Sequence, residues 1–175
     1  SYYLLANMTS LYSYLSLSKA LGIHDKSVKE YIGHMENSYL AYELKQFAFS
    51  LKEQANSKKK LYYADNGFYR LAFDFSPNKG RLFENLAATE LIKCGYELFH
   101  FNTDTECDFI ARKDGQLLAF QVCYELNDSN RGRELKSLSA LPFGVGGKYI
   151  ITYNQTDTAE DVSILPFWDF FGCAV

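Results

Sequence analysis

The chain has 175 residues, of which 47% are hydrophobic and 22% are charged. This composition is typical of a globular protein of about one to one and a half domains, and it excludes a largely disordered chain. No apolar run approaches the roughly 18 to 20 residues that a membrane-spanning helix needs, so we expect no membrane partner. The formal net charge of −3 excludes a polyanion binder that relies on bulk positive charge.

The charge is unevenly distributed along the chain. Residues 1–60 carry eight lysines against five acidic residues, whereas residues 61–175 carry ten basic and sixteen acidic residues. The two parts therefore suit different partners, and we predict a domain at 1–60 followed by a second domain at 61–175.

The four cysteines are separated by 13, 16 and 50 positions and form no CxxC motif. This spacing excludes a zinc ribbon or a redox motif, and the three dispersed histidines argue against a His/Cys metal site. No signal peptide follows Ser1, so we expect reduced thiols, a cytoplasmic location and a chain that is part of a longer protein.

The first predicted elements are helices. Residues 2–14 are apolar without strand alternation, and a short helix at 17–21 has Ser16 as its candidate cap and Gly22 as its end. Apolar residues then recur at helical spacing from 28 to 39. Helix, glycine-containing turn and helix form a helix-turn-helix arrangement.

Apolar residues alternate with polar ones at 42–44 and again at 47–51, which predicts a hairpin and makes 1–60 similar to a winged helix. Such a helical unit is alternatively a dimer or docking surface. The set that would face a DNA groove is weakly basic, lacks arginine, and suits phosphate contact better than bidentate reading of guanine. It consists of Lys26, Ser27, Lys29, Glu30 and His34.

Helices and strands alternate in the second part. A short aromatic segment at 162–171 closes the chain. The preceding pattern predicts a helix at 81–93, strands at 96–101, 107–112 and 117–125, a helix at about 127–140 and a strand at 148–153.

The Asp114-Gly115 pair predicts a tight hairpin turn and with it a strand register. If these two residues form the loop, cross-strand partners have numbers that sum to 229, so Asp108 faces Gln121. A four-residue loop gives the same register, whereas a three-residue loop shifts it. Because side chains alternate between the faces of a strand, one face carries four residues of interest. These are Glu106, Asp108, Gln121 and Cys123.

Three segments of the second part carry a family resemblance: GRLFENLAATEL, ECDFIA and LLAFQVCYEL. They resemble the C-terminal region of a bacterial and archaeal family of AAA-type ATPases, and residues 16–52 are similar to the winged helix of that family. The resemblance implies an α/β (α+β) fold with an N-terminal winged helix-turn-helix. A PD-(D/E)xK restriction-endonuclease-like domain would follow, with a central mixed sheet flanked by helices.

In active PD-(D/E)xK enzymes three acidic side chains hold Mg²⁺ and a lysine polarises the attacking water. The resemblance places Glu84 at the helix acid and Asp108 at the first strand acid. Gln121 stands in place of the second acid and Cys123 in place of the lysine. Because Gln121 brings no charge and Cys123 is no ammonium group, we expect a degenerate site without cleavage. A displaced base such as Lys93 is the remaining route to activity.

Glu84 has a second interpretation as a partly buried acid that pairs with Arg81 or Arg133. Three charged residues, Arg131, Arg133 and Glu134, open the following helix. We expect a solvated face there rather than a phosphate contact.

The glycines at 144–147 form no nucleotide-binding loop. A P-loop requires Gly at position 142 and Ser or Thr at position 149, but the chain has Pro142 and Tyr149. These glycines also precede a strand, whereas a P-loop follows a strand and opens a helix. We expect ATP to bind only in an N-terminal module outside this sequence.

The predicted function is a C-terminal recognition module of an AAA-type ATPase that associates with DNA and with its own ATPase module. One alternative is a protein-interaction or homo-oligomerisation module, because the acidic second part would repel nucleic acid. Another is a divergent Mg²⁺-dependent nuclease that rests on Glu84 and Asp108, with Gln121 as a third candidate ligand.

Overall fold

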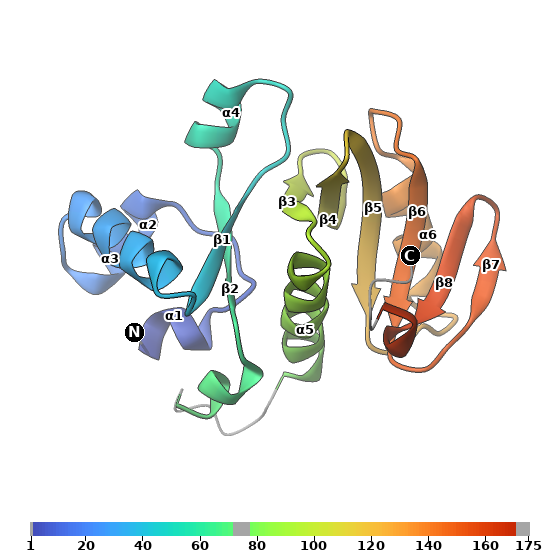
Figure 1. Cartoon of the computed structure of the whole chain (residues 1–175), viewed down its shortest axis with the longest axis horizontal. Coiled ribbons are helices and arrows are strands. Elements are labelled where there is room, and N and C mark those ends of the chain that lie inside the picture. Colours follow the sequence, from blue (N-terminus) through green and yellow to red (C-terminus); the bar gives the residue numbers. More distant parts are fainter. Residues whose placement is uncertain (1, 72–77, 171–175) are drawn as a thin grey trace. The chain divides into compact units, whose positions relative to one another are not determined.

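The computed structural model describes residues 2–71 and 78–170, and the chain divides into two compact units between residues 77 and 78. Each unit has its own sheet (Figure 1). The domain boundary expected at residue 60 falls within a strand of the first unit, β2 (Lys59–Tyr63).

The first unit begins with two helices, α1 (Tyr2–Ala6) and α2 (Tyr14–Leu21). The single helix expected at 2–14 is therefore wrong, and so is Ser16 as the cap of the next helix. Ser13 caps α2: its Oγ accepts from the Ser16 N–H at 3.1 Å, while the Ser16 Oγ accepts from the Ser13 N–H at 2.9 Å. This reciprocal capping box starts α2 three residues earlier than expected.

The predicted turn and third helix are confirmed. Gly22 ends α2 with a φ of +66°, a conformation that suits glycine because a Cβ would be strained there. Next, α3 (Asp25–Asn37) follows, with Asp25 in its first turn. Val28 and Ile32 are buried on one side of α3, as the helical spacing predicted.

A two-stranded antiparallel sheet completes this unit. The strand β1 (Ala41–Lys45) pairs with β2, and the helix α4 (Leu51–Asn56) lies between them in the chain. The expectation that 47–51 forms the second strand is wrong, because Ser50 caps α4 and Leu51 is 80% exposed.

The second unit contains a six-stranded mixed sheet with the strand order β3-β4-β5-β6-β8-β7, which confirms the predicted mixed sheet and α+β class. Strands β3, β4 and β5 are antiparallel, β5, β6 and β8 are parallel, and β7 is antiparallel to β8. No helix among the described residues is long and apolar enough to cross a membrane. The elements are α5 (Lys79–Lys93), β3 (Glu97–Asn102), β4 (Glu106–Lys113), β5 (Gln116–Cys123), α6 (Arg131–Ser139), β6 (Gly147–Thr152), β7 (Asp157–Ala159) and β8 (Val162–Pro166).

The predicted hairpin register is confirmed. Phe109 pairs with Phe120 and Lys113 with Gln116, so partner numbers sum to 229. Asp114 and Gly115 have φ values of +51° and +78°, as a tight primed turn requires.

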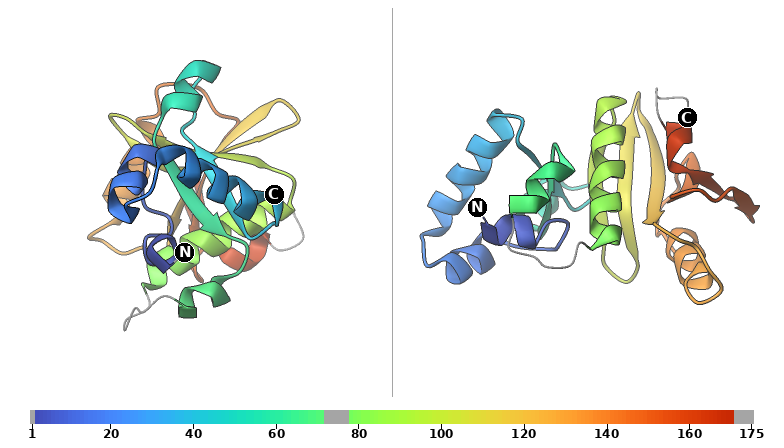
Figure 2. Two further views of the ribbon diagram at one scale, coloured as in Figure 1. Left: turned by 90° about the vertical axis from the view of Figure 1, so that its left-hand side faces the viewer. Right: turned by 90° about the horizontal axis from the view of Figure 1, so that it is seen from below.

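The two helices of this unit pack on opposite faces of the sheet (Figure 2). On one face, Phe83 of α5 contacts the ring of Tyr124 just beyond β5, with ring centroids 5.5 Å apart. On the other face, Glu134 of α6 bonds to Gln121 of β5. The alternation along β5 thus directs Gln121 toward α6.

The cysteines differ from the expectation of reduced thiols throughout. Cys107 and Cys123 are free, but Cys94 is disulfide-bonded, so the expectation is wrong for that residue. Cys173 and residue 171 of the predicted aromatic segment lie outside the described residues.

Candidate functional site

Three of the four site residues predicted from the sequence lie around one open pocket of about 550 Å³ in the second unit, whereas Cys123 does not line it. Glu84 of α5 lines it together with Asp108 of β4 and Gln121 of β5, so the structure brings these three predicted positions together. Acidic residues outnumber basic ones in the lining. The other charged residues there are Asp104, Glu106, Arg133, Glu134 and Lys136.

Asp108 is buried and is held by the backbone of the neighbouring strand. Its Oδ2 accepts from the Val122 N–H at 2.9 Å, and its own N–H donates to the Gln121 Oε1 at 3.2 Å. The two strands therefore exchange side-chain-to-backbone hydrogen bonds at this position. One carboxylate oxygen of Asp108 is already committed within the hairpin.

Gln121 bridges the strand hairpin and α6. While its Oε1 accepts from the Asp108 N–H, its Nε2 donates to the Glu134 Oε2 at 2.8 Å. Glu134 is only 4% exposed, and its other oxygen pairs with Arg133 at 2.6 Å. A buried glutamine whose amide uses both ends in this way holds the hairpin against the helix and stabilises the Glu134 carboxylate.

Glu134 is thus a buried member of the site, and the expectation of a solvated face is wrong for it. Arg133 remains 79% exposed at its side chain and meets that expectation, although its ion pair with Glu134 raises the pKa of the guanidinium. Glu84 was expected to pair with Arg81 or Arg133, and of these two Arg133 pairs with Glu134.

Cys123, which the resemblance placed at the lysine position, is half-buried at the end of β5. Its Sγ accepts from the Asn130 Nδ2 at 3.4 Å and donates to the Glu125 carbonyl oxygen at 3.2 Å. Burial, and after it the Glu134 carboxylate, raise the pKa of this thiol. Cys123 is therefore a neutral group, which cannot supply the positive charge of a lysine.

The Gln121 position offers Mg²⁺ no anionic ligand, although five carboxylates line the pocket. A hard cation prefers several oxygens that carry negative charge. Gln121 stands where the resemblance places the second acid, but it is neutral and its carbonyl oxygen already accepts a hydrogen bond. Among residues 2–71 and 78–170, no group of three or more His, Cys, Asp or Glu side chains is arranged to hold a metal ion. Lys93, the candidate displaced base, pairs with Glu90 on its own helix and does not line the pocket.

The predicted DNA-facing residues lie on α3 of the first unit. Lys26, Lys29, Glu30 and His34 are exposed and Ser27 is partly exposed, while Val28 and Ile32 are buried on the other side of the helix. The chain therefore presents these side chains to solvent.

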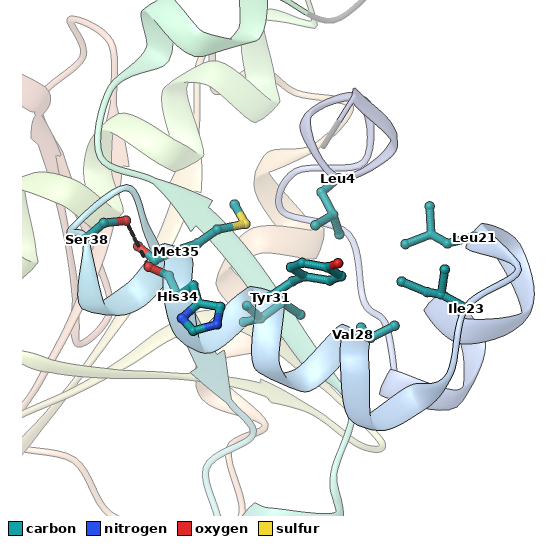
Figure 3. Close-up of a pocket in the computed structure, with 9 residues that line it drawn as sticks. Leu4, Leu21, Ile23, Val28, Tyr31, His34, Met35 and Ser38 are labelled. Atoms are coloured by element: carbon teal, nitrogen blue, oxygen red, sulfur yellow. Dashed lines mark hydrogen bonds between the residues drawn. The ribbon is translucent and has the colours of Figure 1, made fainter.

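An apolar groove of about 550 Å³ lies beside this surface. In Figure 3, Leu4 from α1 lies opposite Tyr31 from α3, and Leu21 and Ile23 lie at the turn between α2 and α3. No pattern in the sequence indicated this groove. Its remaining lining residues are Val28, Ile32, His34, Met35 and Ser38.

Two protein-family models together match residues 2–170 of the chain. Residues 2–79 match the model of a domain of unknown function, DUF8612, and residues 79–170 match that of another, DUF4143. The chain belongs to the DUF4143 family. DUF4143 is found C-terminal to AAA ATPase domains in many proteins, and the boundary between the two matches lies next to the division between the compact units.

Two curated relatives of this DUF4143 protein are uncharacterized. A protein of Methanocaldococcus jannaschii is 33% identical over 94% of the chain, and a protein of Haemophilus influenzae is 30% identical over 64% of it. The alignments cover only 41% and 28% of those relatives, so the chain spans less than half of either. No solved structure matches the chain.

The DUF4143 unit also contains site residues that sequence reasoning missed. Glu134, in the first turn of α6, bonds to Gln121. Asn130, just before α6, bonds to Cys123. A signal for Glu134 was present, because Leu138 follows it at helical spacing and is fully buried, which places both on the inward face of α6.

Proposed function

We propose that this chain is the C-terminal recognition module of an AAA-type ATPase, that it associates with DNA through α3, and that its nuclease-like unit does not cleave. The winged helix-turn-helix and restriction-endonuclease-like folds are part of this proposal, as is action in the cytoplasm. The position of DUF4143 domains behind AAA ATPase domains in many proteins supports the ATPase context.

The observation that carries the non-cleaving site is the double use of the Gln121 amide. In a working site of this kind, the second acid would direct an anionic oxygen at the metal. Here the same position accepts from the Asp108 N–H and donates to Glu134, so both of its polar atoms serve the fold. The half-buried Cys123 also lacks the charge that would orient water and stabilise a phosphorane.

The DNA-contacting part of the proposal rests on the exposed face of α3. Lys26, Lys29 and His34 are exposed and Ser27 is partly exposed, whereas Val28 and Ile32 of the same helix are buried. Lysines and hydroxyls contact phosphates, and the absence of arginine favours positioning on the backbone over reading of bases.

The test is a titration of the protein with a fluorescent DNA duplex at 50 mM and 200 mM salt. We expect affinity to fall steeply as salt rises, because phosphate contact releases counterions. In Lys26→Ala/Lys29→Ala, the affinity at 50 mM salt should fall by about tenfold or more and the salt dependence should become shallower, since two phosphate contacts are lost.

The matched control is Lys93→Ala/Lys113→Ala, which removes the same charge from the surface of the second unit. This variant should bind as the wild type does. An equal loss in both double variants would reduce the effect to net charge, and no measurable binding at 50 mM salt would reject the DNA role.

A protein-interaction module is the second candidate function, and the apolar groove beside α3 favours it. Ile23 and Tyr31 are both exposed there on a surface that Leu4 and Met35 extend. Homo-oligomerisation is one form of this alternative, and it predicts a mass in solution that rises with protein concentration.

A further inference from the structure

The apolar groove of the first unit has walls from three elements. The helix α1 contributes Leu4, the turn after α2 contributes Ile23, and α3 contributes Tyr31 and Met35. Figure 3 shows these side chains around a common space, with His34 and Ser38 at the C-terminal half of α3. Tyr31 is 62% exposed and Ile23 is 37% exposed, so the described residues leave the groove open to solvent.

We propose that this groove binds an amphipathic helix from the ATPase portion of the same polypeptide, and thereby docks the first unit on its motor. This inference rests on the proposed function, because it takes the ATPase to precede this region in the chain. It adds the surface through which the ATPase would hold the module.

The chemistry of the groove favours a helix with an apolar ridge. Its lining is almost entirely aliphatic or aromatic, and a helix that carries branched or aromatic residues at i, i+3 or i+4, and i+7 fills such a groove. Nucleic acid is a poor occupant, because its phosphates would face a lining without a Lys or Arg side chain.

The position of the groove favours an occupant from the same polypeptide. Leu4 belongs to α1, so one wall of the groove comes from the helix that would follow the ATPase directly in the domain order that the proposed function assumes. A segment joined to that wall through a short connection has an effective concentration in the millimolar range. Such a concentration fills the groove even when the free affinity is weak.

The size of the relatives and the domain order of many DUF4143 proteins are consistent with such a segment. The chain covers 41% of the Methanocaldococcus jannaschii relative and 28% of the Haemophilus influenzae relative. DUF4143 follows AAA ATPase domains in many proteins. In polypeptides of that design, the part that precedes α1 is the ATPase.

The experiment compares side-chain accessibility in the full-length polypeptide and in the 175-residue chain. Tyr31→Cys and, separately, Ile23→Cys are introduced into both, and the rate of maleimide labelling at the new thiol is followed by mass spectrometry. We expect labelling at least tenfold slower in the full-length polypeptide. The matched control is Leu15→Cys. Leu15 lies on α2 outside the groove and is 60% exposed, so a cysteine there should be labelled at the same rate in both proteins.

Equal rates at positions 23 and 31 in the two proteins would overturn the inference. Slow labelling already present in the 175-residue chain would assign the groove to another part of that chain, and rates that fall with protein concentration would assign it to a second copy. Either outcome would reject a helix of the ATPase as the occupant of the groove. Duplex affinity, measured on the same samples, separates the two proposals, because retained DNA binding with an accessible groove leaves the proposed function standing.

Discussion

Gln121 and Glu134 stabilise the second unit through a hydrogen bond between two buried side chains. The amide links the Asp108 backbone to a carboxylate that is 4% exposed, and Arg133 neutralises that carboxylate from the solvent side. Buried polar groups of this kind cost free energy when a partner is removed, since the remaining group has no water to replace it. The position that would hold a nuclease acid therefore has a structural role.

We predict that Gln121→Ala lowers the free energy of unfolding by about 2 kcal/mol, because it leaves the Asp108 N–H and the Glu134 Oε2 without their partner. Urea denaturation monitored by circular dichroism measures the change. Gln116→Ala, at the exposed start of β5, is the control and should change stability by less than about 0.5 kcal/mol. Equal effects of the two substitutions would contradict a structural role for Gln121.

The Cys123 thiol provides a pH-dependent test of the same site. Burial and the Glu134 carboxylate raise its pKa, so the reactive thiolate should appear only above the usual range of a cysteine. We predict that the rate of alkylation at Cys123, followed by mass spectrometry, has its midpoint above about pH 8.5. In Glu134→Gln the midpoint should move to lower pH, whereas Glu125→Gln, which changes a neighbouring exposed acid, should leave it nearly unchanged. An unchanged midpoint in Glu134→Gln would show that this carboxylate does not raise the pKa of Cys123.

At the scale of single residues, local turn chemistry made one part of the site predictable. The Asp114-Gly115 turn determines the hairpin register, and the register places Asp108 next to Gln121. Glu134 reaches the same place from a helix after a separate connection, and no register rule links it to the hairpin. Only its spacing from Leu138 indicated that it faces inward.

Among the elements, β1 is anchored by a carboxylate that two tyrosines share. The Glu43 Oε1 accepts from the Tyr12 hydroxyl at 2.5 Å and its Oε2 accepts from the Tyr14 hydroxyl at 2.7 Å. Tyr12 also exchanges backbone hydrogen bonds with Lys59 of β2. The segment before α2 is thereby held against both strands of the first unit.

This cluster predicts an alkaline limit to stability. Burial and Glu43 raise the pKa of Tyr12 and of Tyr14 well above the usual value of about 10. A group with a raised pKa in the folded state contributes stability below its unfolded pKa, and that contribution is lost as the pH rises above it. Unfolding free energy should therefore fall as the pH rises beyond about 10.

In Glu43→Gln these tyrosines should ionise at lower pH than in the wild type, since burial and the smaller effect of Glu36 remain but the hydrogen-bonded carboxylate is lost. Absorbance at 295 nm during an alkaline titration measures this. Glu53→Gln on the exposed surface of α4 is the control and should titrate as the wild type does. Superimposable curves for Glu43→Gln and the wild type would show that the carboxylate has no such effect.

Elements were predictable where burial and periodicity agree, as in α3 and α5. The alternation at 47–51 was misleading, because Phe49 and Leu51 are 81% and 80% exposed. The better signal was the spacing of Ser50 and Glu53, which is typical of a helix start. The three-residue β7 was too short to show a period.

At the scale of the whole molecule, the change in charge near residue 60 does not mark the end of the first unit. Lys59 and Lys60 lie in a lysine run that the sequence analysis assigned to the end of the first domain, yet both are buried in β2. The Lys59 ammonium donates to the carbonyl oxygens of Ala55 and Ser57, which compensates for its burial. The strand that closes the first unit therefore continues past residue 60.

The central claim is that the molecule recognises DNA without cleaving it, and strand integrity tests this most directly. Purified protein is incubated with a labelled duplex and Mg²⁺ or Mn²⁺, and the products are separated on a denaturing gel. We predict an intact duplex, with the wild type and Asp108→Ala indistinguishable, because Gln121 and Cys123 supply neither the second acid nor the lysine. Metal-dependent cleavage by the wild type that disappears in Asp108→Ala would contradict it.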